Sequence, residues 1–91
     1  MTVKVIRLTS GEEIIAKVTT TDNGYYLTNP LILLPTEKGK LTFATWMPYM
    51  KDDRLFIQKG GILFDFTPVD AMAAQYLKST SSIDLSAATS L

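Results

Sequence analysis

The sequence predicts one small, mainly β domain with a single helix near its C-terminus. Turn-forming residues recur about every ten residues, a spacing typical of small β domains. Between the turns lie short apolar runs, and one later stretch carries apolar residues at helical spacing. Of the 91 residues, 46% are hydrophobic and 20% are charged, which indicates a globular chain and not a disordered one.

The turns divide the first part of the chain into candidate strands. The run Glu13–Val18 alternates apolar and polar residues, as a half-buried strand does, and Ser10-Gly11 before it predicts a hairpin turn. Asn23-Gly24 predicts a type I′ turn, which needs positive φ at both residues, and so a second hairpin. The predicted strands cover residues 3–9, 12–21, 25–34, 41–50, 55–58 and 62–66.

One helix is predicted over residues 67–79, packed on a β domain formed by residues 1–66. Thr67 suits the N-cap, Pro68 the first helical position and Asp70 the position three after the cap. Residues 80–91 are predicted to be a flexible or loosely docked tail, held only where Ile83 and Leu85 find a groove. The apolar face of the helix consists of Val69, Met72, Ala73, Tyr76 and Leu77.

The residue inventory argues against catalysis. The chain has no histidine and no cysteine, which removes the commonest general base and the commonest metal ligands. The carboxylate pairs Glu12-Glu13 and Asp52-Asp53 cannot act as dyads, because neighbours on a strand point to opposite faces. Lys59–Gly61 lacks the spacing of a phosphate-binding loop. We therefore predict no enzyme activity, no cofactor, no metal and no small-molecule substrate.

Charge and hydropathy limit the partners. Nine basic and nine acidic residues give a formal net charge of 0, which argues against a strongly basic nucleic-acid binder. No run approaches the roughly 18 apolar residues of a membrane span, and the N-terminus lacks the apolar segment of a signal peptide. These features predict a cytoplasmic protein without a membrane partner.

Two stretches are apolar on both faces, which is unusual in a small antiparallel domain. They are "LILL" at residues 31–34 and "TWMPYM" at 45–50, where Pro48 favours an edge strand. An apolar edge pairs readily with another chain, so we predict a homo-oligomer. The alternative is that the C-terminal helix or the tail covers these stretches. The predicted subunit contacts are Leu31, Leu33, Trp46, Met47 and Tyr49.

Ile14, Ala16 and Val18 alternate along the second predicted strand, Asp22 enters the loop that follows, and Tyr25, Tyr26 and Leu27 come after it. This spacing resembles the first signature of the Sm-like family. The second signature is matched loosely by "FIQKGGILF", with a rival placement on "MKDDRLFI". With "WMP" before the last strands and a C-terminal helix, the chain is most similar to short Sm-like proteins of cyanobacterial phages, which would place it in the host cytoplasm.

The resemblance implies a strongly bent, five-stranded antiparallel barrel of the SH3-like (Sm) type. It further implies a ring, of five to seven subunits, whose edge strands pair between subunits and whose pore binds single-stranded, uridine-rich RNA. Carried over to this chain, the RNA-binding residues are Asp22, Asn23, Tyr25, Tyr26, Lys59 and Gly60.

Two positions depart from the family pattern. Tyr26 stands where the family has an Asn that reads the base edge, and Lys59 stands in place of an Arg. Lysine lacks the planar fork that binds a base or phosphate at two points. We therefore predict weak binding of single-stranded RNA, by stacking on the tyrosines. The alternatives are that Tyr25 or Tyr26 belongs to the core or an interface, and that the protein is an oligomeric scaffold without nucleic acid.

Overall fold

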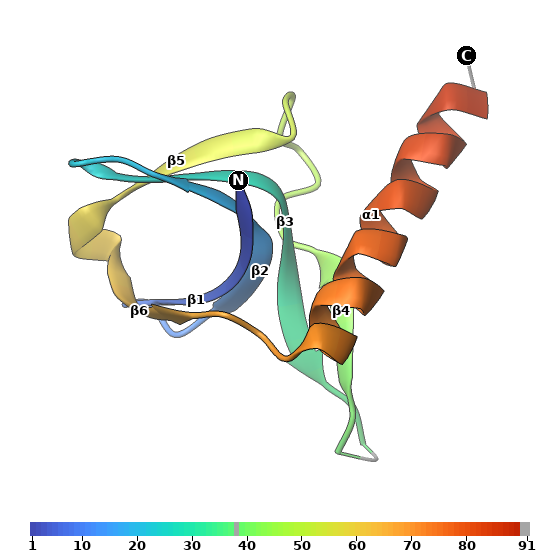
Figure 1. Cartoon of the computed structure of the whole chain (residues 1–91), viewed down its shortest axis with the longest axis horizontal. Helices are drawn as coiled ribbons and strands as arrows, with labels where there is room; N and C mark the ends of the chain where they lie inside the picture. The colour runs from blue at the N-terminus through green and yellow to red at the C-terminus, as the bar shows by residue number, and fades with distance from the viewer. Residues whose placement is uncertain (38, 90–91) are drawn as a thin grey trace.

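The fold is a small, strongly bent antiparallel β-barrel with one C-terminal helix, as predicted (Figure 1). The computed structural model describes residues 1–37 and 39–89, with side chains described as far as residue 80. The elements are β1 (Thr2–Leu8), β2 (Glu13–Thr20), β3 (Gly24–Pro35), β4 (Leu41–Thr45), β5 (Arg54–Gln58), the 3₁₀ turn η1 (Lys59–Gly61), β6 (Ile62–Phe66) and α1 (Asp70–Thr89).

The six strands form one sheet with five positions across it, because β4 and β5 both pair with β3, one after the other along its length. β2 pairs with β3 along most of its length, from Thr20 opposite Tyr25 to Ile14 opposite Ile32. The other edge of β3 is shared by two strands. β5 pairs with residues 24–28 of β3, and β4 pairs with residues 31–35. The remaining rows follow in the order β2, β1, β6, and all pairs are antiparallel.

β3 bends between these two halves. Asn29 has φ 52°, and the buried Pro30 follows it. The backbone N–H of Asn29 is turned out of the sheet ladder and donates to the carbonyl oxygen of Asp53, at 2.7 Å. The predicted strand 25–34 is confirmed, although the prediction did not include this bend. Asn-Pro is a turn signal, so the sequence did carry a hint of it.

Tyr76 fixes α1 to the bend. Its side chain is fully buried, and its hydroxyl donates a hydrogen bond shared between the carbonyl oxygens of Asn29 (2.7 Å) and Thr28 (3.1 Å). Because Asn29 has left the regular ladder, these carbonyls need a partner from outside the sheet. The helix thus supplies both apolar cover and a hydrogen bond at the point where β3 changes direction.

The sheet is buried on both faces in its first three strands, because neighbouring residues point to opposite sides. Inside the barrel lie Ile6, Leu8, Ile14, Ala16, Val18 and Leu27. Between the sheet and α1 lie Val5, Ile15, Leu31, Leu33 and Tyr76.

The cover of "LILL" therefore comes from the chain's own helix, as the alternative expectation had it. Leu31 is only 7% exposed and Leu33 only 9%. Both side chains pack in one cluster with Tyr76 of α1, so the burial of this stretch does not require another subunit.

β4 ends at Thr45, so the prediction of a strand to residue 50 is wrong. A turn follows, in which the backbone N–H of Met50 donates to Met47. Trp46 packs against the interior cluster, Met47 is half-buried, and Tyr49 is 83% exposed. These three predicted contact residues therefore lie in a loop and not on an apolar edge strand.

α1 begins later and ends later than predicted. The carbonyl of Val69 accepts from the backbone N–H groups of Met72 and Ala73, so Thr67 is not the cap and Pro68 precedes the helix. The helix runs to Thr89, ten residues beyond the predicted end. Residues 90–91 of the predicted tail, and the side chains of Ile83 and Leu85, lie outside the described part of the chain.

The β2–β3 hairpin is confirmed, but the type I′ turn is wrong. The glycines with positive φ are Gly11, in the predicted first turn, and Gly39, and not Gly24. Thr21 closes the second turn, because its backbone N–H donates to Gly24 and its hydroxyl oxygen accepts from the Gly24 N–H. Gly24 is needed for a different reason: a Cβ there would lie 2.1 Å from the carbonyl oxygen of Ile57 on β5.

Candidate nucleic-acid interface

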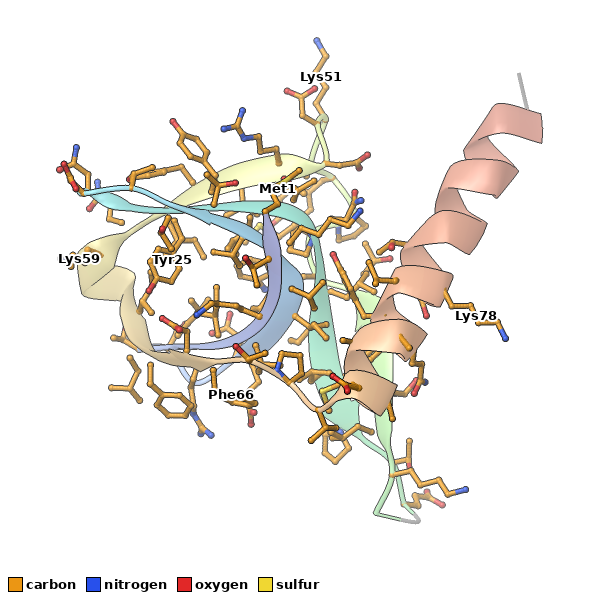
Figure 2. The ribbon with its side chains drawn as sticks, viewed as in Figure 1. Met1, Tyr25, Lys51, Lys59, Phe66 and Lys78 are labelled. Carbon is orange, nitrogen blue, oxygen red and sulfur yellow. The ribbon has the colours of Figure 1, made fainter. Side chains whose placement is uncertain are left out.

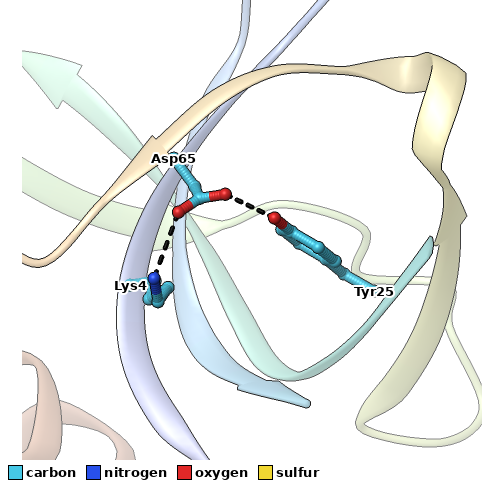
Figure 3. Close-up of polar contacts among 3 residues, drawn as sticks. All are labelled: Lys4, Tyr25 and Asp65. Atoms are coloured by element: carbon cyan, nitrogen blue, oxygen red, sulfur yellow. Dashed lines mark hydrogen bonds and ion pairs between the residues drawn. The ribbon is translucent and has the colours of Figure 1, made fainter. Parts of the chain in front are cut away.

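Tyr25 points into the barrel and not toward solvent. Its hydroxyl donates to Asp65 on β6 at 2.5 Å, and Asp65 also accepts from Lys4 on β1 at 3.1 Å (Figure 3). The ring packs against the interior cluster. In the described part of the chain no ladder joins β5 to β6, so this network links β3 to β6 across the interior. Tyr25 is thus a structural residue, as the alternative expectation had it.

The network shifts the pKa values of its two acids in opposite directions. The pKa of Asp65 is lowered from 3.8, mainly because the Tyr25 hydroxyl donates to the carboxylate and also because Lys4 lies beside it, while partial burial opposes this. The pKa of Tyr25 is raised above 10.0, because its proton is held by the hydrogen bond to Asp65 and because the neighbouring charge disfavours a phenolate.

Acid should weaken this network. The folded pKa of Asp65 lies below its ordinary value of 3.8, so its contribution to stability is present above that value and is lost as the pH falls through the folded pKa. We expect Asp65→Asn to lower the free energy of unfolding by about 1–2 kcal/mol near neutral pH. The difference from wild type should shrink below about pH 4. Urea unfolding at a series of pH values measures this difference in free energy. Asp22→Asn, at an exposed position, is the control. A difference that does not depend on pH would contradict the assignment.

The two predicted loops do lie together. The backbone N–H of Lys59 in η1 donates to the carbonyl of Asn23 at 3.0 Å, which joins the β2–β3 turn to the turn before β6. Asp22, Asn23, Lys59 and Gly60 are all exposed there. Figure 2 shows Lys59 at the rim of the barrel and Tyr25 within it. Four of the six predicted residues therefore form one exposed corner.

Tyr26 lies on the opposite face of β3 from Tyr25, in a cluster with two residues of β5. The Arg54 guanidinium carbon is 4.0 Å from the centre of the Tyr26 ring. The Phe56 ring lies directly across the strand pair, tilted by 56° at a centroid distance of 4.9 Å. Arg54 and Phe56 are both exposed. Neither was among the predicted binding residues, although both lie in "MKDDRLFI", the rival placement of the second signature. The register of β5 on β3 is needed to bring them to Tyr26.

The strand registers define the surface around this cluster, which we call the open sheet face. Residues directly opposite each other in an antiparallel pair share a face. α1 covers the sheet farther along, over Ile15 and Leu31, but not here. The open sheet face has two cationic side chains and no carboxylate. Its members are Lys17, Thr19, Tyr26, Thr28, Arg54, Phe56 and Gln58.

Other kinds of site are not found in the described residues. Among these residues no three His, Cys, Asp or Glu side chains gather to hold a metal ion. None of the helices they form is long and apolar enough to cross a membrane. Comparison of the chain with protein-family models and with curated protein sequences gives no match.

Proposed function

We propose that this chain is a non-catalytic, Sm-like, ring-forming protein that binds single-stranded RNA weakly on its open sheet face. The observation that carries the proposal is the Tyr26 cluster, in which Arg54 and Phe56 flank an aromatic ring on two solvent-facing strands. Aromatic rings beside a cation are the usual means of holding unpaired bases, at about 1–3 kcal/mol per stacked base.

Arg54 supplies a property that Lys59 lacks. Its planar guanidinium stacks on Tyr26 and can also bind a phosphate in two places, whereas a lysine acts only as a point charge. Lys17 extends the positive charge onto β2 of the same face. The arrangement thus combines a surface for bases with cations for the backbone.

The open sheet face also leads to the exposed corner. Gln58 lies opposite Gly24, and Lys59 follows it beside Asn23. The path along β5 from Arg54 to Lys59 is about 16 Å long, from the rise of a strand. A single RNA strand lying along β5 would therefore pass both the Tyr26 cluster and the exposed corner at Lys59. The resemblance to Sm-like loops supports binding at the corner.

RNA binding should depend on the Tyr26 cluster. We expect Tyr26→Ala, Phe56→Ala and Arg54→Ala each to weaken the binding of labelled U-rich and A-rich single strands about 5-fold or more. The measurement is fluorescence anisotropy at low salt. Since the formal net charge is 0 and few cations line the path, the affinity should fall only shallowly with salt.

Two controls make this experiment selective. Tyr49→Ala removes an exposed aromatic ring from the loop after β4, outside the open sheet face, and should leave binding unchanged. Lys59→Ala tests the corner separately. If no strand binds at tens of micromolar protein, the proposed function is wrong. If RNA binds but the three cluster variants bind it as wild type does, the activity stands and the site is wrong.

A second candidate function is that of a homo-oligomeric scaffold without nucleic acid. The observation in its favour is the exposure of large apolar side chains on an outer strand of the sheet, with Leu63 60%, Phe64 45% and Phe66 44% exposed on β6. Apolar groups clustered on a sheet edge are typical of a protein contact. This role is compatible with RNA binding, because the open sheet face and β6 are separate surfaces.

A further inference from the structure

β4 and α1 lie next to each other (Figure 1), and a groove lies between them. Its volume is about 540 Å³, and it is open to solvent. This volume is within the roughly 300–1,000 Å³ of ligand pockets in proteins. Leu31 and Phe43 give the groove an apolar floor, and Thr45 of β4 and Lys78 of α1 also line it. The groove can therefore take an apolar side chain and a polar one together.

β4 forms one wall of the groove, and its outer edge has none of the usual protection against pairing. Among the described strands β4 pairs only with β3, so one row of its backbone N–H and C=O groups has no strand partner there. Sheet edges are commonly protected by charged residues, by proline or by a bulge. β4 contains no charged residue and no proline, and its register on β3 has no shift. An extended segment can therefore add to this edge as a further strand.

A segment added to β4 would turn every second side chain toward the groove, because alternate residues of a strand point to the same face. The groove lies on the face of the sheet that α1 covers. Thr45 lies opposite Leu31, which belongs to the cluster beneath the helix, and Phe43 packs against the same cluster. Two side chains of the segment, two positions apart and roughly 7 Å from each other, would therefore both face the groove.

The charge of the groove favours an acidic partner. Lys78 is exposed and is the one charged side chain among the described residues that line the groove. Its ammonium has three N–H donors, so it can bind an incoming carboxylate in addition to its contacts within the chain. Because the lining has no carboxylate, an acidic side chain meets attraction there without repulsion, whereas a basic one is repelled.

The chain's own outer strands do not offer the matching side chains. β4 itself has no charged residue, and β5 has the cation Arg54 and no acidic residue. The acid of β6 is Asp65, which lies inside the barrel and accepts hydrogen bonds from Tyr25 and Lys4. A second copy of this chain would therefore bring no available carboxylate to Lys78 through these strands. The groove fits a partner of different sequence.

We propose that the groove binds an extended segment of another protein that carries an apolar and an acidic side chain two positions apart. The segment adds to β4 as a further strand, its apolar side chain lies on Leu31 and Phe43, and its carboxylate pairs with Lys78. Main-chain hydrogen bonds to β4 supply affinity, and the two side chains supply specificity. The open sheet face belongs to β2, β5 and the first half of β3, so this site does not depend on RNA binding.

Fluorescence anisotropy with labelled model peptides tests the spacing and the charge. The probe is a nine-residue threonine peptide with leucine at its fourth position and glutamate at its sixth, since threonine favours extended structure. It should bind about 5-fold or more tightly than the same peptide with glutamate moved to the fifth position, which points to the opposite face. It should exceed a peptide with lysine at the sixth position by at least as much. Equal binding of all three, or no binding of the probe at tens of micromolar protein, would overturn the proposal.

Exchange of the charges tests the role of Lys78. Lys78→Glu, at an exposed position, should lose the preference for the glutamate peptide and prefer the lysine peptide. Lys51→Glu makes the same change of charge in the loop before β5, well apart from Lys78 (Figure 2), and should keep the wild-type preference. Circular dichroism checks that both variants are folded. A folded Lys78→Glu variant that still prefers the glutamate peptide would show that the proposed site is wrong.

Sedimentation velocity distinguishes a partner segment from a second copy of this chain in the groove. Addition of the glutamate peptide should leave the mass of the wild-type species unchanged apart from the bound peptide. Release of smaller species from an assembled wild type would show that another copy occupies the groove, and this result would overturn the proposal.

Discussion

Tyr76→Ala is expected to lower the free energy of unfolding by about 3–5 kcal/mol, which is a large part of the stability of a small domain. The side chain is fully buried between α1 and the sheet, and the Phe43 ring packs against it edge-on. Its hydroxyl is also the hydrogen-bond partner of the carbonyls at the bend of β3. Urea unfolding followed by circular dichroism measures the change.

Two variants separate packing from hydrogen bonding at this position. Tyr76→Phe keeps the ring and should cost about 1–2 kcal/mol, because the carbonyls of Thr28 and Asn29 lose their donor. Leu77→Ala, at the next position and 42% exposed, is the control and should cost about 0.5 kcal/mol. A Tyr76→Phe variant as stable as wild type would mean that the bend does not depend on this hydroxyl.

Substitution of Gly24 should be the next most damaging single change. Gly24→Ala is expected to lower the free energy of unfolding by about 2–3 kcal/mol, because its Cβ would collide with the carbonyl oxygen of Ile57 and press β5 away from β3. Gly24→Val should be at least as severe. Thermal and urea unfolding both measure the effect.

Gly24→Asn distinguishes this cause from the predicted turn. Asparagine tolerates positive φ, so it would cost little in a type I′ turn, whereas the collision with β5 predicts a loss at least as large as that of alanine. Gly60→Ala is the control, since a Cβ there meets no atom within 4 Å and should be close to neutral. A Gly24→Asn variant as stable as wild type would contradict the collision with β5 and would support a type I′ turn.

The candidate site could be predicted from the sequence only in part. The sequence, with the family resemblance, indicated the loop residues Asn23 and Lys59, and the structure brings them together through a backbone hydrogen bond. It also indicated both tyrosines, but it left open which of them faces inward. Alternation along a strand separates Tyr25 from Tyr26 and leaves the choice of face to the packing. The structure sends Tyr25 to Asp65 and leaves Tyr26 outside.

The rival placement of the second signature included Arg54 and Phe56, but the sequence could not show that they lie beside Tyr26. Their own alternation puts them on one face of β5, but nothing local says which strand lies beside them. The register that sets Phe56 opposite Tyr26 is a long-range property, fixed by the close approach of β5 to Gly24 and by the loop between β4 and β5. A pairing shifted by one residue would move both side chains to the barrel interior.

The sequence by itself determined the class of the fold, the hairpins and the presence of the helix. These follow from periodicity and turn chemistry, which act over a few residues. Only the tertiary structure decided what covers the apolar stretches, because Leu31 and Leu33 need a partner and the sequence does not say whether α1 or another subunit supplies it. It also decided the ends of β4 and α1, since Trp46 turns into the barrel and Val69 is the residue that accepts the first helical hydrogen bonds. Local propensity favours an element, but burial against distant residues decides where that element stops and which of its faces remains free to bind.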